Sequence, residues 1–346
     1  MKTKAITTTI IFEGFALNRD ENLAKNILSI KTIRRFDKTF SFLGKNAMRH
    51  YLFKTLNRGY DWRPSSVTMS KSKSGNTQAV LQFDLTKNDI INSEELDAFG
   101  YMYTIGGQGA LTRKATVHIT KAVSLEPYRG DLALYSNHDL VKRGQRQGIN
   151  CTPDLFHKQE HNSFFKVSFT IDCEKLGTDE WFFDEYNEKE KKGIIKGNKE
   201  KFVKDFSYYL TNPEKALISL EKVNNKVKAT FKIPQEEKKK RILQILNSIK
   251  DGFSAYTSES NTIIPLFIIS AGVRVPSPIF FPYINVYFNT LQVTGIEDCL
   301  ANGWIDTKVY IKESDRLKAR PKDIEENKTK ITNNWDEFLK ELELQE

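Results

Sequence analysis

The sequence has little cysteine and no long apolar run, and both absences narrow the class of protein. Its three cysteines, Cys151, Cys173 and Cys299, form no close pair and no CxxC spacing, and their odd number argues against a disulfide framework. No segment approaches the roughly 20 apolar residues that a membrane-spanning helix needs. The amino-terminal stretch alternates threonine with isoleucine, which predicts a strand and not a signal peptide. We therefore expect a protein of the reducing cytoplasm.

The sequence also lacks the phosphate-binding loop of nucleotide hydrolases. The pattern GxxxxGK[ST] does not occur, and the glycine-rich turn at residues 106–109 (GGQG) is not followed by the required lysine. ATP or GTP hydrolysis is therefore not expected, and no cofactor is predicted.

Positive charge is present, and it is unevenly distributed. Residues 1–150 contain 23 Lys and Arg against 13 Asp and Glu, whereas the remainder of the 346-residue chain is close to neutral. The hydrophobic content of 39% and the aromatic content of 12% are those of a folded protein. A neutral bulk with one basic half predicts a polyanionic partner, either nucleic acid or an anionic membrane.

Hydrophobic periodicity predicts a mixed α and β chain. The apolar stripe of Met48, Tyr51, Leu52 and Leu56 predicts a helix, and residues 164–172 (FFKVSFTID) alternate as a strand should. Helices are predicted at residues 44–56 and 235–250, and strands at 5–17, 115–123, 164–172, 261–275 and 282–293. Residues 124–163 are expected to be a polar, turn-rich connection, residues 174–235 mostly helical, and the tail from Lys312 a charged helix docked through Trp335, Phe338 and Leu339. Without its insertions the order is strand, helix, strand, strand, helix, strand, which predicts an α+β ferredoxin-like or RNA-recognition fold.

The densest basic cluster lies between Arg34 and Lys73. Ten Lys and Arg residues there are opposed only by Asp37 and Asp61. One interpretation is a solvated face that keeps the protein soluble. The other is a groove that follows a phosphate backbone, with nearby aromatic residues as platforms for bases. A membrane surface is the weaker interpretation, because no long helix opposes a basic face to a broad apolar one.

A second basic patch occupies residues 140–148 (LVKRGQRQG). Lys142, Arg143 and Arg146 there would suit contact with a nucleic acid strand, although an ordinary exposed loop fits equally well. Arg113 and Lys114, after the glycine-rich turn, are either contacts or surface residues.

Two enzymatic alternatives have weaker support. Residues His157 to His161 match the HxxEH pattern of zinc peptidases, but Pro153 and the strand near Phe164 leave no room for a long helix, so both histidines are expected to be exposed loop residues. Asp20 and Glu21, together with Asp131 and His138, could form an acid–base ribonuclease site only if the fold brought them together.

Four sequence blocks resemble the DevR-type backbone subunit of type I-B CRISPR Cascade complexes. They read FEGFALNRDENLAKNILSIKTI (residues 12–33), FSFLGKNAMRHYLF (40–53), GYMYTIGGQGALTRKATVHITKAVSLEPYRGDL (100–132) and DGFSAY (251–256). The resemblance covers residues 5–175 well and 235–295 loosely.

The resemblance implies a right-hand-like subunit in several copies along one guide RNA. It would hold the guide without reading its sequence, in contact with further copies of itself, other Cascade subunits and, through the guide, a target DNA strand. The implied parts are a palm (1–58, 113–123, 164–175 and 235–295), a fingers-like insertion (59–112) and a thumb-like insertion (124–163). The resemblance does not cover a helical insertion (176–234) and a charged helical tail (296–346), which are predicted from the residues alone.

The residues expected to contact guide RNA come from the loop, the helix and the thumb. They are Asn18, Arg19, Lys31, Arg34, Arg35, Lys45, Asn46, Arg49, His50, Arg113, Lys114, Lys142, Arg143 and Arg146, with Ser254 and Tyr256 as further candidates. Type I members of the family are not nucleases. Related type III subunits cut RNA with an aspartate in a loop near the first strand, which keeps Asp20 open as a metal-dependent ribonuclease residue.

Overall fold

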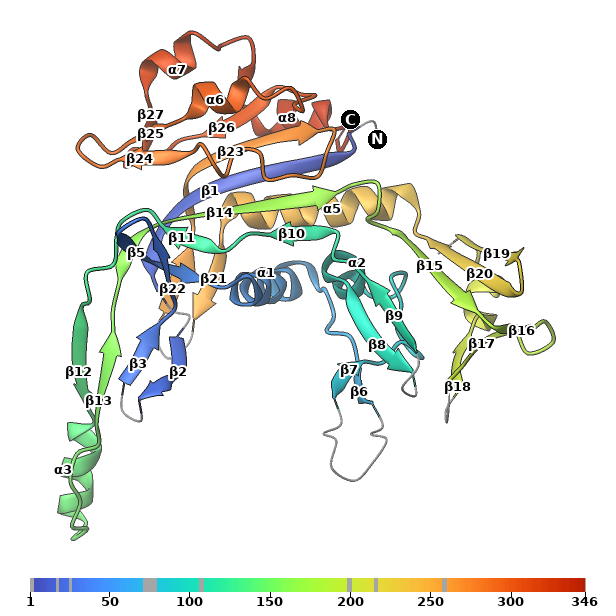
Figure 1. Ribbon diagram of the computed structural model, residues 1–346, viewed down its shortest axis with the longest axis horizontal. Coiled ribbons are helices and arrows are strands. Elements are labelled where there is room, and N and C mark those ends of the chain that lie inside the picture. The colour runs from blue at the N-terminus through green and yellow to red at the C-terminus, as the bar shows by residue number, and fades with distance from the viewer. Residues whose placement is uncertain are drawn as a thin grey trace.

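The computed structural model describes residues 3–16, 19–24, 27–70, 80–105, 109–197, 201–214, 217–256 and 260–345. Within them the chain is a mixed α+β protein built on one large sheet, from which several smaller strand pairs project (Figure 1). Among the helices of this part of the chain, none is both long enough and apolar enough to cross a membrane.

The large sheet is centred on β1 (Ala5–Phe15), which pairs antiparallel with β14 (Asn162–Asp172) on one side and β23 (Pro265–Val273) on the other. Both faces of β1 are buried, which explains its nearly continuous run of isoleucine, phenylalanine and threonine. The remaining strands are β10 (Val117–Ile119) and β11 (Ala122–Ser124) beside β14, then β5 (Lys38–Leu43) and β4 (Thr32–Arg35), with β26 (Val309–Lys312) and β28 (Ile331–Thr332) beyond β23.

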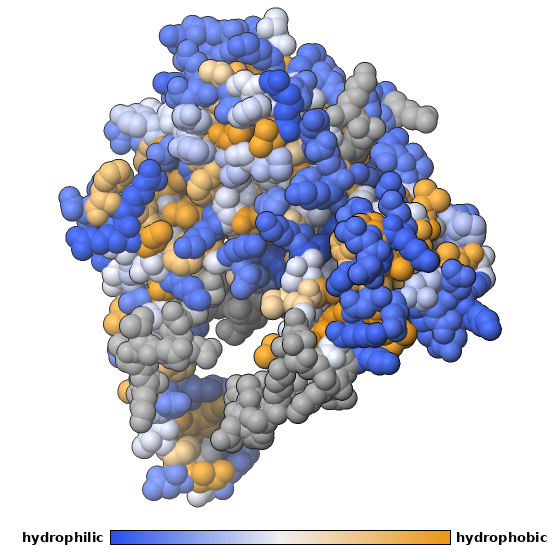
Figure 2. Space-filling model, turned by 45° about the vertical axis from the view of Figure 1, so that its right-hand side comes forward, coloured by the Kyte–Doolittle hydropathy of each residue, from blue (hydrophilic) through white to orange (hydrophobic). Residues whose placement is uncertain are grey.

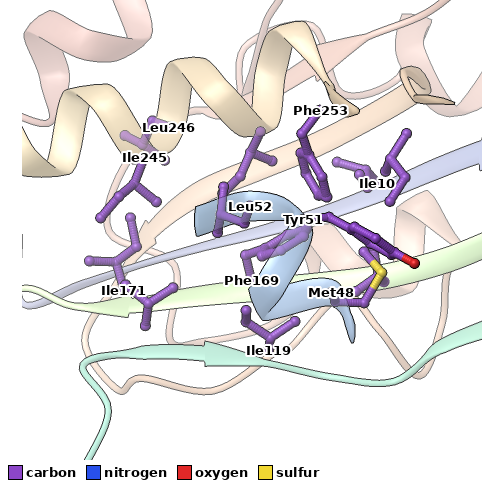
Figure 3. Packing of buried hydrophobic residues seen from close by; sticks show 14 of the residues in the cluster. Ile10, Met48, Tyr51, Leu52, Ile119, Phe169, Ile171, Ile245, Leu246 and Phe253 are labelled. Carbon is purple, nitrogen blue, oxygen red and sulfur yellow. The ribbon is translucent and has the colours of Figure 1, made fainter. Parts of the chain in front are cut away.

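Two helices cover one face of this sheet. They are α1 (Lys45–Tyr60) and α5 (Gln235–Asp251), close to the helices that the sequence predicts. Figure 3 shows Tyr51 and Leu52 of α1 with Ile245 and Leu246 of α5 above Phe169 and Ile171 of β14. The apolar stripe of each helix and the alternation of β14 therefore meet in one core, as their periodicities predict.

The carboxy-terminal segment covers the opposite face with a second core. It contributes β24 (Asn285–Tyr287), β25 (Gln292–Thr294), α6 (Ile296–Leu300), β27 (Lys318–Ala319) and α7 (Pro321–Glu325). The final helix, α8 (Trp335–Glu341), returns to the first core, where Phe338 and Leu339 are buried and the Trp335 indole donates to Asn247 Oδ1 at 3.1 Å. The predicted docking residues are confirmed, but the tail contains strands and short helices instead of one charged helix.

Residues 176–234 are mostly strands, so the expectation of a helical insertion is wrong. They form β15 (Thr178–Phe183), β16 (Glu185–Asn187), β17 (Lys192–Lys196), β18 (Lys201–Asp205), β19 (Leu217–Val223) and β20 (Lys226–Lys232), with one short helix, α4 (Ser207–Thr211). Charged residues occupy the exposed positions of these strands, while Trp181, Phe202 and Phe231 alternate inward. The high charge density hid this two-residue period.

The third core joins that strand-rich module to two hairpins from earlier in the chain. These hairpins are β6 (Val67–Met69) with β7 (Leu81–Phe83) and β8 (Tyr101–Ile105) with β9 (Gly109–Arg113), and α2 (Glu94–Phe99) lies between them in sequence. Leu96 of α2 and Tyr101 of β8 pack in the same cluster as Trp181.

Residues 132–159 form a projecting arm, so the expectation of a turn-rich connection is wrong there. The arm consists of β12 (Leu132–Ser136), α3 (His138–Arg146) and β13 (Leu155–Gln159). Its strand β13 also pairs with β3 (Ile27–Ile30), which in turn pairs with β2 (Arg19–Ala24). Figure 1 shows the arm and the β6–β7 hairpin projecting to the same side of the sheet, with α1 between them.

A buried ion network fixes the strand-rich module and α2 to α5. The Asp97 carboxylate accepts from Arg113 at 2.6 Å, from Arg241 of α5 at 2.9 Å and from the Gly177 amide at 2.8 Å. The side chains of Asp97, Arg113 and Arg241 are only 1%, 7% and 2% exposed. Arg241 also donates to the Ile90 carbonyl at 2.7 Å. One carboxylate therefore compensates two guanidinium groups from elements far apart in the sequence.

Replacing Asp97 should be strongly destabilising. Asp97→Asn removes the carboxylate shared by two buried guanidinium groups and leaves Arg113 with Asp179 at 3.5 Å and Arg241 with Glu237 at 3.2 Å. We expect the free energy of unfolding to fall by about 3 kcal/mol. Urea denaturation followed by circular dichroism measures this. The matched control is Asp139→Asn, which breaks an ion pair with Arg143 whose side chains are 67% and 72% exposed, and it should change stability by about 0.5 kcal/mol or less. Equal stability of the two variants would contradict the assigned role of the network.

Candidate nucleic-acid interface

The basic cluster of the sequence is divided by the fold, and its most exposed part is the β4–β5 hairpin. Arg34, Arg35 and Lys38 are all exposed there. Among the described residues, none of the three forms an ion pair with a carboxylate. These cations are therefore free to meet phosphate oxygens.

The same hairpin is anchored at the base of the arm. The Tyr128 amide donates to the Thr39 carbonyl at 2.7 Å, and the Ser41 hydroxyl lies 2.7 Å from His161 Nδ1. Strand β5 also pairs with β11, which precedes the arm. The hairpin is thus bonded to the two segments that flank the arm in the sequence.

The HxxEH motif at this junction cannot be a zinc site of the peptidase type. Its first histidine, His157, lies on strand β13, and His161 immediately precedes β14, so the motif is extended and not helical. His161 is buried, against expectation, and its ring contacts Tyr128 and Phe165 edge-on. Within the described ranges, no group of three or more His, Cys, Asp or Glu side chains could hold a metal ion.

The arm carries the second basic patch on its helix α3. Lys142, Arg143 and Arg146 are exposed, and Arg143 makes a 2.7 Å ion pair with Asp139 one turn earlier. Because that pair is exposed, it is weak and easily exchanged for a phosphate. The two strands of the arm add a feature that sequence reasoning missed: Tyr135 and Phe156 stack at 5.6 Å, and Lys158 lies 4.3 Å above the Tyr135 ring. The local signal is the spacing of Phe156 and Lys158, which share one face of an extended strand because they are two positions apart.

The four candidates on α1 do not share one role. Lys45, Asn46 and His50 are exposed, whereas Arg49 turns toward α2 and contacts Glu95 at 3.4 Å and the Phe99 ring at 5.0 Å. Partial burial lowers the pKa of Arg49, and Glu95 opposes that effect. Arg49 also lines an open pocket of about 450 Å³ with the exposed apolar residues of the β6–β7 and β8–β9 hairpins. On the face drawn in Figure 2, hydrophilic side chains predominate and apolar ones gather in separate patches.

Arg113 is a structural residue and not an exposed contact. Its guanidinium is held by Asp97, by Asp179 at 3.5 Å and by the Thr178 carbonyl at 2.5 Å. The neighbouring Lys114 is exposed and stays a candidate. Strand alternation separates the two, since consecutive residues face opposite sides.

The remaining candidates are placed only in part. Asn18 lies outside the described residues, and Arg19 and Asp20 are placed through their backbone in β2, opposite Ile30 and Ser29. Lys31 is half-buried, between β3 and β4. Ser254 is exposed on β21 (Phe253–Tyr256), and Tyr256 is placed by its backbone alone.

Asp131 and His138 do not form an acid–base pair. The five-residue strand β12 separates them, and at about 3.3 Å per residue they lie on the order of 20 Å apart. The ribonuclease assembly that combines these two residues with Asp20 and Glu21 is therefore wrong as drawn from the sequence.

His161 should make the junction between hairpin and arm sensitive to acid. Burial lowers the pKa of His161, with Glu126 and Asp131 opposing, so the folded state favours the neutral ring. The unfolded chain titrates near pH 6.5, so this stabilisation is complete above that pH and is lost as the pH falls below it, by at most about 1.4 kcal/mol per pH unit for one proton.

We expect the melting temperature of His161→Gln to depend less on pH between 7.5 and 5.5 than that of the wild type. Burial also lowers the pKa of His118, so the wild type and every variant share that contribution. The control is His138→Gln, at an exposed position on α3, which should follow the wild type. Parallel curves for all three proteins would refute the role of His161.

Comparison with known proteins gives one family and a set of distant structural matches. A family model described as "CRISPR-associated negative auto-regulator DevR/Csa2" matches residues 6–292. Two solved chains are similar at 9% sequence identity. One, from a "CRISPR RNA-guided surveillance complex, pre-nicking", has a TM-score of 0.45, covering 82% of this chain and 83% of that one. The other, from a "CRISPR RNA-guided surveillance complex", has a TM-score of 0.41, covering 81% and 73%. No curated protein sequence matches the chain.

Proposed function

Because the chain belongs to the DevR/Csa2 family of CRISPR-associated proteins, we propose that it is the repeated backbone subunit of a type I-B Cascade complex in antiviral defence. It binds guide RNA without regard to sequence, polymerises along it beside other Cascade subunits, and meets target DNA through base pairing to the guide. The observation that carries the proposal is the exposed basic surface of the β4–β5 hairpin at the base of the arm. It places uncompensated cations where a phosphate backbone can pass.

The strand order supports the palm that such a subunit needs. Strands β23, β1, β14 and β10 are neighbours in an antiparallel arrangement, with α1 and α5 inserted as the two crossover helices on one face. This connectivity supports our assignment of the palm to the split βαβ pattern of ferredoxin-like and RNA-recognition folds. The arm at residues 132–159 is then the thumb, and the β6–β7 and β8–β9 hairpins are the fingers.

The division of charge assigns different roles along the RNA. Arg34, Arg35 and Lys38 hold the backbone beside the palm, and Lys142 and Arg146 meet it at the arm. Lys45, Asn46 and His50 extend the surface along α1, and Lys114, Arg143, Asn18, Arg19 and Lys31 are secondary contacts. Phosphate contacts of this kind fix the register of a strand and carry no sequence information.

The purified protein should bind single-stranded RNA with an affinity that falls steeply with salt. Arg34→Ala with Lys38→Ala should weaken binding and reduce the slope of log K against log salt by about 0.7 for each lost phosphate contact. Fluorescence anisotropy with a labelled RNA of mixed sequence, from 50 to 300 mM salt, measures both quantities. The matched control is Lys328→Ala with Lys330→Ala, two exposed lysines in the carboxy-terminal segment, which should leave the slope unchanged. An unchanged slope in the hairpin variant would remove the basis of the proposal.

The RNA should remain intact in this complex. We expect no cleavage of labelled RNA with Mg²⁺ or Mn²⁺, and no difference between wild type and Asp20→Ala on a denaturing gel. Cleavage at regular intervals that disappears in Asp20→Ala would instead establish the ribonuclease alternative.

A further inference from the structure

Phe36 is the most exposed large hydrophobic residue of the described chain. It occupies the tip of the β4–β5 hairpin, where Arg35 and Lys38 pair and Phe36 and Asp37 form the turn, and it is 85% exposed. Exposing a phenylalanine ring to water is unfavourable, and a turn needs no aromatic residue. The exposed ring is therefore a candidate ligand contact.

The backbone at Phe36 adds a second, independent observation. Its φ is +53°, in the left-handed region, at the first position of a two-residue hairpin turn. Glycine, asparagine and aspartate adopt this conformation easily, whereas a bulky residue there is strained. Strain of this kind is retained mostly at functional sites. Asparagine would suit the turn better and would expose less apolar surface to water, so the ring serves something other than the fold.

The surroundings of Phe36 identify the chemistry of the ligand. The Arg35 guanidinium lies 5.5 Å from the ring centroid, and the alternation of β4 and β5 places Ile33, Lys38 and Phe40 on the same face as Arg35. Lys121, which immediately precedes the adjoining strand β11, lies 4.6 Å above the ring of Phe42 on β5. Aromatic rings interleaved with cations that have no carboxylate partner suit stacked bases on a phosphate chain. A protein partner would need a broader apolar patch than this hairpin offers. Beside Phe36, its exposed large hydrophobic residue is Ile33, at 39%.

We propose that Phe36 is a stacking residue for an unpaired base of a single nucleic acid strand held by the hairpin cations. The inference rests on the proposed function, because the same cations hold the strand. The base can belong to the guide RNA or to a single DNA strand, since every base offers a π face.

Three variants distinguish the effect of the aromatic ring from that of apolar volume and from that of the turn conformation. Phe36→Tyr keeps the ring, Phe36→Leu keeps apolar bulk without it, and Phe36→Asn suits the left-handed turn and has neither. All three should fold, because the side chain makes no buried contact. Each protein is titrated with a 2-aminopurine-labelled single-stranded RNA and, separately, with the DNA strand of the same sequence.

Phe36→Tyr should bind like the wild type and quench the 2-aminopurine. Phe36→Leu and Phe36→Asn should both lose affinity by about 5- to 100-fold and lose the quenching, without any change in the salt slope. The strand that shows these losses, RNA or DNA, is the source of the stacked base.

The negative outcomes are distinct from one another. Wild type that binds neither strand would overturn the proposed function and this inference together. If the wild type binds a strand with the expected salt dependence and Phe36→Leu binds it equally well, the stacking role of Phe36 is refuted and the proposed function is not. Unchanged nucleic acid binding with weaker self-association in sedimentation would assign Phe36 to a protein contact and equally refute the stacking role.

Discussion

The structure depends on one buried carboxylate, Asp97, shared between two arginines. Arg113 comes from a projecting hairpin and Arg241 from a helix of the main core, and the Gly177 amide completes the site. Because leaving a buried charge without a partner costs more than the pair contributes, the network favours this mutual arrangement of the three segments. The hairpins beside the proposed RNA path are thereby held to the helix that backs the sheet.

The arm is held to the sheet by fewer and weaker interactions than this network. The arm is attached to the sheet by neutral contacts, including the Ser41–His161 hydrogen bond and the backbone pairing of β13 with β3, and its helix α3 has no buried residue. A protein that holds a nucleic acid strand from two sides benefits when one side is rigid and the other can adjust to the strand. The ion network and the sparsely packed arm provide these two conditions within one chain.

The central part of the fold could be predicted from the sequence, since long apolar periods govern it: β1, α1, β14, α5 and β23 lie close to where their patterns place them. The strand-rich module could not, because its lysines and glutamates resemble a charged helix. The arm could not, because its exposed strands and polar residues resemble a turn-rich connection. For the site, Arg34, Lys45 and Lys142 are exposed, as contact with RNA requires, and their contact with RNA stays a prediction. The ion pairs of Arg113 could not be predicted, because its partners Asp97 and Asp179 are 16 and 66 positions away and no local pattern reveals a tertiary ion pair.

Strand β4 also ends the large sheet, so its outer row of backbone amides and carbonyls has no strand beside it within the described sheet. Such an edge is a template on which a second molecule can add its own edge, and natural proteins oppose this with short strands and charge. Strand β4 is only four residues long and includes Arg34 and Arg35, so it is both short and charged. The cations that suit the hairpin to a nucleic acid therefore also guard against aggregation, so binding and solubility constrain the same residues.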